Sequence, residues 1–192
     1  MELRGVAIAE GDMLVLCLRL APELLLGRYT VPAAQDPQSR LAVHEARLFA
    51  EARALLAAVR GKHRGALANA LLLPRCVPLV EAVGHRMAAE AARDAGVPAP
   101  LVRLYELGAQ GTDLAAYIEY GLTTRQAFAE EEARALDEVY EGLEGYLKQA
   151  GVERYATATI VSQERWDKYV ESLDVYRGSS EWTPFADAKA RL

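Results

Sequence analysis

Hydrophobic residues recur along most of the chain at the spacings of three and four that are typical of an amphipathic helix. The clearest example lies between Ser39 and Arg60, where Leu41, His44 and Leu48 share one face and charged residues occupy the other. We therefore predict a helix over this segment, with Ser39 as its N-cap. Its register places His44 on the core side, where we expect a buried and hydrogen-bonded imidazole.

Glycine and proline divide the rest of the chain into further helical segments. Residues 13–28 are apolar on most faces, and we expect Pro22 to kink or break the helix there. Gly108 and Gly111 should separate two shorter helices. The remaining helices are predicted over 74–95, 101–108, 112–120, 125–150 and 163–173.

Three of these segments also carry predictions about packing and capping. Gly142 and Gly145 each cost a helix about 1 kcal/mol relative to Ala, so their presence within 125–150 favours the close approach of another helix. The expected N-caps of the last two helices are Thr124 and Ser162. The core face of the helix over 74–95 should carry Val80, Val83, Met87 and Ala91.

The pattern as a whole indicates an all-α protein, a bundle of five to seven helices. No segment shows the two-residue alternation of a strand, and the chain contains no internal repeat. With 192 residues the chain is long enough to bury one sizeable core. We predict a single helical domain over 1–177 and a tail over 178–192.

Charge and cysteine content narrow the classes of partner and compartment. The net charge of -5 and the pI near 5.3 argue against a nucleic-acid partner. Cys17 and Cys76 lie among apolar residues without the spacing of a zinc or redox motif, so we expect two buried thiols and a reducing compartment.

Targeting signals are weak in this sequence. The apolar run 13–18 is too short for a membrane span, and the acidic residues Glu2, Glu10 and Asp12 do not suit a signal peptide. The final tripeptide, Ala190-Arg191-Leu192, follows the pattern of a peroxisomal address. Because the chain is rich in Ala, Leu, Arg and Glu and poor in Lys, we favour a cytoplasmic bacterial protein and keep the peroxisome as the alternative.

Several chemistries are excluded by their missing motifs. The chain has no glycine-rich phosphate loop and no Gly-x-Ser-x-Gly elbow. A carboxylate di-iron site needs Glu-x-x-His pairs, whereas Glu81 and His85 are one residue too far apart. We interpret Glu81 and His85 as a surface pair on one helix face, and we predict no metal site.

The strongest candidate chemistry lies at residues 10–12, Glu-Gly-Asp, directly before the first apolar helix. A carboxylate on a glycine turn at the mouth of a buried helix is a candidate proton-abstracting base. A purely structural explanation also exists. Asp12 is a suitable N-cap, Gly11 suits the turn, and Glu10 is an acidic residue of the kind favoured near a helix N-terminus.

The surrounding residues favour the catalytic interpretation. The run 9–16, Ala-Glu-Gly-Asp-Met-Leu-Val-Leu, resembles the Glu-Gly-Asp segment of acyl-CoA oxidases and the apolar helix behind it. The wider acyl-CoA dehydrogenase superfamily has a related Glu-Gly-Thr. Residues 79–87 also resemble the C-terminal helical region of some oxidase-like members. One departure is Met13, which stands where the oxidases usually carry Asn.

The resemblance implies a role for each motif residue. Glu10 matches the base that removes the α-proton of an acyl-CoA thioester while FAD accepts the β-hydride. Gly11 and Asp12 match residues that lie close to the flavin. A carboxylate screened from water by a bound acyl chain has a raised pKa, which suits it to this proton transfer.

The resemblance also implies that most of the enzyme is supplied from elsewhere. In this family an N-terminal helical domain and a middle β-domain precede the glutamate and hold most of the flavin and the ester. We therefore expect this chain alone to be inactive and to retain no FAD. Its partner would be a complementary N-terminal subunit or further copies of itself. The alternative is a non-catalytic helical module that uses its apolar first helix to bind a partner or to dimerise.

Overall fold

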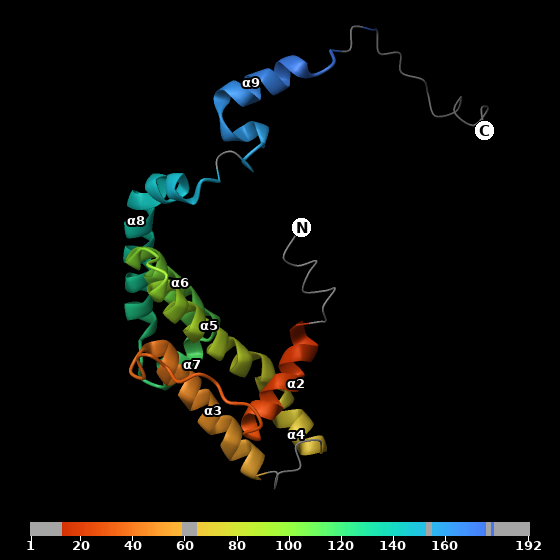
Figure 1. Ribbon diagram of the computed structural model, residues 1–192, viewed down its shortest axis with the longest axis vertical. Coiled ribbons are helices and arrows are strands. Elements are labelled where there is room, and N and C mark those ends of the chain that lie inside the picture. Colours follow the sequence, from red (N-terminus) through yellow and green to blue (C-terminus); the bar gives the residue numbers. More distant parts are fainter. Residues whose placement is uncertain (1–12, 59–64, 153–154, 176–177, 179–192) are drawn as a thin grey trace, which may run out of the picture. The chain divides into compact units, whose positions relative to one another are not determined.

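The computed structural model describes residues 13–58, 65–152, 155–175 and 178, and every regular element in this part of the chain is helical (Figure 1). The all-α prediction is therefore confirmed. Helices of ten or more residues number six within the described segments, which agrees with the expected bundle of five to seven. The elements are α2 (Met13–Leu25), α3 (Arg40–Ala58), α4 (Ala66–Leu71), η1 (Leu73–Arg75), α5 (Cys76–Asp94), α6 (Ala99–Thr112), α7 (Leu114–Glu119), α8 (Arg125–Ala150), η3 (Thr159–Val161) and α9 (Gln163–Ser172).

The chain divides into two compact units, Met1–Gly142 and Leu143–Leu192. In the first unit α5 is the central helix, and α2, α3 and α6 all pack against it (Figure 1). In the second unit α9 packs against the 3-10 turn η3. Of the predicted tail, 178–192, only residue 178 lies within the described residues.

Side-chain caps begin the helices at the three predicted positions. The Ser39 hydroxyl accepts the Ala42 N–H at 3.3 Å, and Thr124 accepts the Ala127 N–H at 3.1 Å. Ser162 caps α9 in the same way. Each cap satisfies an N–H that has no partner inside the helix, which explains why these boundaries follow from local sequence.

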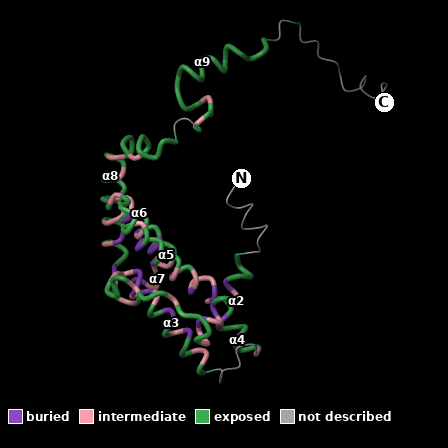
Figure 2. Tube along the Cα trace, viewed as in Figure 1, coloured by how far each residue is buried: buried purple, intermediate pink, exposed green. Residues whose placement is uncertain are grey.

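The main core lies where α2, α3, α4 and α5 meet. Figure 2 shows buried positions concentrated on these helices and on α6 and α7. Both cysteines are buried free thiols, as predicted. A second apolar cluster joins α3, α5, α6 and α7 through Leu41, Ala89, Ala109 and Tyr117. The larger cluster contains Ala21, Leu24, Leu48, Phe49, Ala52, Ala68, Leu72, Cys76, Leu79 and Ala82.

The predicted core face of α5 is right in its first half and wrong in its second. Val80 and Val83 are half-buried and pack against the main core, as predicted. Met87, assigned to the core, is 40% exposed, and Ala91 is also exposed. The buried face instead carries Leu79, Ala82 and Arg86, followed by Ala89 and Glu90. A prediction from apolar periodicity places Arg86 on the surface. In the structure its ion pairs allow Arg86 to be buried, so the packed face of α5 includes it.

The predictions at Gly108, Gly111 and Gly145 are also wrong, and the break allowed for at Pro22 does not occur. Helix α6 runs through Gly108 and Gly111 and ends at Thr112. At Gly111 an added methyl group would lie 3.5 Å from the Phe128 ring, which is an ordinary van der Waals distance. Gly145 faces open space, so the close packing expected there is absent. Helix α2 continues through Pro22 and ends at Leu25.

One continuous helical stretch of the described chain, Ala66–Asp94, meets the length and composition criteria for a membrane-crossing segment. It comprises α4, η1 and α5. A single stretch of this kind is weak evidence, because core helices of other proteins satisfy the same criteria. The expected absence of a membrane span therefore stays a prediction.

Candidate functional site

The predicted base and flavin contacts, Glu10, Gly11 and Asp12, lie outside the described residues, as do Ala190, Arg191 and Leu192. What the structure describes is the helix directly after the motif. Helix α2 is held in the core by its second half, where Cys17, Ala21 and Leu24 are buried. These three residues follow each other at spacings of four and three, so they form one packed stripe.

The first turn of α2 has the opposite character. Met13, Val15 and Leu16 are 64%, 59% and 51% exposed, and Leu20 is 38% exposed. Burying apolar surface stabilises a protein by about 25 cal/mol for each Å² removed from water, and these exposed side chains do not make that contribution. The residues nearest the motif therefore form an apolar patch, which we call the α2 patch: Met13, Val15, Leu16 and Leu20.

A flavin held at the motif would need a pocket at the N-terminal end of α2. The larger open pocket, of about 390 Å³, is lined by Leu24, Tyr29, Phe49 and Arg53, among others. Leu24 places this pocket at the C-terminal end of α2, and a helix of this length separates its ends by roughly 20 Å. This pocket is therefore remote from the end of α2 that follows Gly11 and Asp12.

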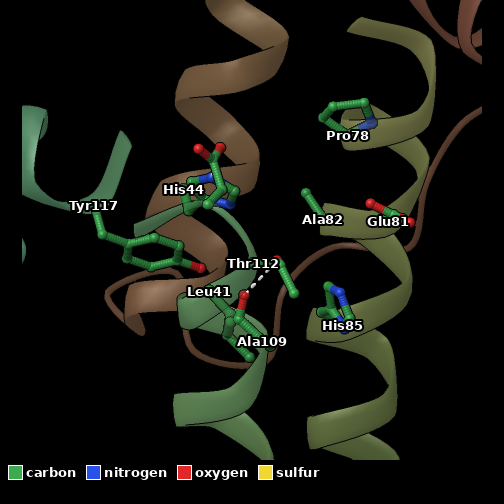
Figure 3. Close-up of a pocket in the computed structure, with 10 residues that line it drawn as sticks. Leu41, His44, Pro78, Glu81, Ala82, His85, Ala109, Thr112 and Tyr117 are labelled. Carbon is green, nitrogen blue, oxygen red and sulfur yellow. Dashed lines mark hydrogen bonds and ion pairs between the residues drawn. The ribbon is translucent and has the colours of Figure 1, made fainter. Parts of the chain in front are cut away.

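A second pocket, of about 170 Å³, lies between α3, α5, α6 and α7 (Figure 3). The His44 Nε2 and Asp113 Oδ2 atoms are 2.9 Å apart, and the imidazole stacks on the Tyr117 ring with 4.3 Å between centroids. His44 is 6% exposed, so the prediction of a buried, hydrogen-bonded histidine is confirmed. We call this the His44 pocket.

Tyr117 is the most deeply buried polar residue of the His44 pocket, with 1% of its surface exposed. Burial and the nearby charge of Asp113 raise the pKa of its phenol far above the usual range, so the hydroxyl stays neutral. Among the described residues this hydroxyl has no hydrogen-bond partner. Since no fully enclosed side-chain N or O atom in that part of the chain lacks a partner, the hydroxyl must be accessible from the pocket.

Helices α5 and α6 supply the other polar groups of the His44 pocket. The His85 Nδ1 atom lies 3.1 Å from the Tyr105 hydroxyl, so the expected Glu81–His85 pair is replaced by a His85–Tyr105 contact. Glu81 is exposed at the edge of the pocket. Thr112 donates its hydroxyl hydrogen to the Ala109 carbonyl at 2.7 Å, as the dashed line in Figure 3 marks.

Sequence patterns identify His44 but miss Asp113 and Tyr117. Neither residue belongs to a recognisable motif, and each lies far from His44 in the sequence. The only available signal is His44 itself, because a buried imidazole requires a hydrogen-bond partner. That requirement does not specify which residue supplies it.

Comparison of the chain with protein-family models, with curated proteins and with solved structures returns no match.

Proposed function

We propose that this chain is the C-terminal helical part of an FAD-dependent acyl-CoA oxidase or dehydrogenase, active only when assembled with flavin-binding domains. The observation that supports this proposal is the α2 patch. Large apolar side chains are exposed directly after the Glu10-Gly11-Asp12 motif, while Cys17, Ala21 and Leu24 of the same helix are buried. A covering domain placed there would bury the patch and enclose the motif.

Within that assembly Glu10 acts as the base. Its carboxylate takes the proton from the α-carbon of the acyl thioester, and the electron pair of that C–H bond stays with the substrate. Covering the α2 patch excludes water, and desolvation raises the pKa of the carboxyl toward the value that a general base needs near neutral pH. FAD belongs to the covering domains in this proposal.

The assembly step is tested by charge substitution in the patch. The chain is co-expressed with the flavin-binding domains of an acyl-CoA oxidase, as wild type and as Leu16→Lys. A buried lysine without a partner is strongly unfavourable, so we expect loss of co-purification and of acyl-CoA oxidation. Leu67→Lys is the matched control, because Leu67 is 56% exposed on α4, and it should assemble normally. Normal assembly of Leu16→Lys contradicts the proposal.

The second candidate is a non-catalytic helical module that binds a partner or another copy through apolar surface. A second exposed stripe favours it: Leu136, Tyr140, Leu143 and Leu147 on α8 are spaced at four, three and four residues. The visible spectrum of the purified chain and its mass in solution test this second candidate. The module predicts no flavin and a dimer or larger species, whereas stoichiometric flavin or a monomer counts against it.

A further inference from the structure

We propose that the His44 pocket binds a small organic ammonium ion. This inference rests on His44, Glu81, Asp113 and Tyr117 and is independent of the acyl-CoA proposal. All of these residues belong to the first compact unit of the chain, Met1–Gly142. The pocket therefore needs no partner chain for its geometry.

The Tyr117 hydroxyl has no hydrogen-bond partner among the described residues. A tyrosine with so deeply buried a ring ordinarily has a hydrogen-bond partner for its hydroxyl, and here the pocket is the side from which a partner can reach it. Among the described residues none pairs with it, although Asp113 and His44 lie close by. Figure 3 shows the ring extending from α7 with its hydroxyl toward the pocket. The arrangement leaves one acceptor and one donor for a bound molecule.

The charged side chains that line the His44 pocket are acidic. Two carboxylates, Asp113 and Glu81, line the pocket, and its lining contains no Lys or Arg among the described residues. Asp113 is held by His44 and keeps a second oxygen, while Glu81 has no hydrogen bond or ion pair within the described chain. The pocket therefore favours a cation over an anion.

The lining of the His44 pocket suits an organic cation better than a metal ion. The described residues contain no group of three or more His, Cys, Asp or Glu side chains placed to hold a metal. An ammonium group instead donates three N–H bonds. The carboxylates of Asp113 and Glu81 and the Tyr117 hydroxyl oxygen are the acceptors that the pocket lining offers to such a group.

The volume and the apolar lining of the His44 pocket indicate which group the ammonium ion carries. Leu41, Pro78 and Ala82 contribute hydrocarbon surface. The volume of about 170 Å³ resembles that of cavities that accept benzene, about 150 Å³. A short alkyl chain attached to the ammonium group fits both properties.

The test uses n-butylammonium as the probe, with n-butanol and butyrate as the neutral and anionic analogues. Binding to the full chain is followed by amide chemical shifts in NMR titrations. We expect saturable binding of butylammonium with a dissociation constant on the order of 1 mM, and shifts confined to residues around the pocket. The two analogues should bind at least about tenfold more weakly, because neither satisfies the carboxylates.

Variants assign the binding to the named groups. Tyr117→Phe and Glu81→Gln should each weaken butylammonium binding about tenfold. Their controls, Tyr140→Phe and Glu138→Gln, change exposed residues of α8 and should leave it unchanged. Glu81 is exposed, so Glu81→Gln tests the proposal even if Tyr117→Phe fails to fold. Absence of saturable binding, equal binding of butanol, or undiminished binding by Glu81→Gln would show a pocket that holds water only and overturn the proposal.

Discussion

Arg86 is the most deeply buried charged residue in the described part of the chain. Its side chain is 2% exposed, with Nε donating to Glu45 at 2.5 Å and Nη1 donating to Glu90 at 2.7 Å. Nη2 donates to the Pro32 carbonyl at 2.9 Å, and Glu90 accepts the Gln35 N–H. Burial lowers the pKa of Arg86, but hydrogen bonds and charge from the two glutamates outweigh it, so the net shift is upward. This network ties α3 and the segment before it to α5.

Removing the charge of Arg86 should therefore destabilise the fold strongly. In Arg86→Met two mostly buried carboxylates lose their partner, and we expect a loss of about 3–5 kcal/mol in the free energy of unfolding, measured by urea titration. Arg28→Met is the control, because Arg28 pairs with Glu23 at an exposed site and its loss should cost less than about 1 kcal/mol. Equal effects of the two substitutions would contradict this account of the core.

Glu131 links stability to pH. It accepts two hydrogen bonds from Arg40 and one from Arg103, and the Arg40 hydrogen bond is the main cause of its lowered pKa. A carboxyl with a lowered folded-state pKa stabilises the fold above its unfolded pKa, near 4.3, and loses that contribution as pH falls through the folded value.

The corresponding variant is Glu131→Gln. At pH 7 it should unfold more easily than the wild type by about 1 kcal/mol, since both arginines are partly exposed and solvent weakens the pairs. Below about pH 4 the difference should shrink as Glu131 becomes protonated. Urea titrations across this pH range measure it, and a difference that grows toward acid pH would refute the assignment.

Helix boundaries that depend on neighbouring residues were predicted correctly, whereas features of helices that depend on distant residues were not. The bounds of α8 were predicted because Thr124 and Gly151 act on their own neighbours: one caps the first turn, and the other adopts φ +62° after the last. The second half of the buried face of α5 was missed because it depends on Glu45, a residue on another helix. The continuity of α6 was missed for a similar reason, since Phe128 packs against Gly111.

The correction at Gly145 leads to a stability prediction. A methyl group added there meets nothing within 4 Å, and the residue lies inside α8. Gly145→Ala should therefore stabilise the chain by about 0.5–1 kcal/mol by lowering the entropy lost on helix formation. Gly151→Ala should destabilise it, because φ +62° strains an alanine. Thermal unfolding of both variants measures the contrast, and a lowered midpoint for Gly145→Ala would contradict it.

At the scale of the whole molecule, the candidate site was predicted only in part. The Glu10 motif and its role come from resemblance, and these residues lie outside the described part of the chain. Periodicity located the apolar helix behind the motif but not which of its residues would remain uncovered. The His44 pocket depends on side chains of four helices meeting, which no local pattern encodes. Physical contact across long sequence separations was the missing information in each case.

The central claim is that Glu10 is the base of an acyl-CoA-oxidising assembly. Its most direct test is the rate of α,β-oxidation by the co-expressed assembly, comparing wild type with Glu10→Gln. Gln has nearly the same shape but cannot accept the α-proton, so we expect the rate to fall by about 10²–10⁴-fold or more, with assembly and flavin content unchanged. Glu2→Gln is the matched control and should retain full activity. An undiminished rate in Glu10→Gln would contradict the account.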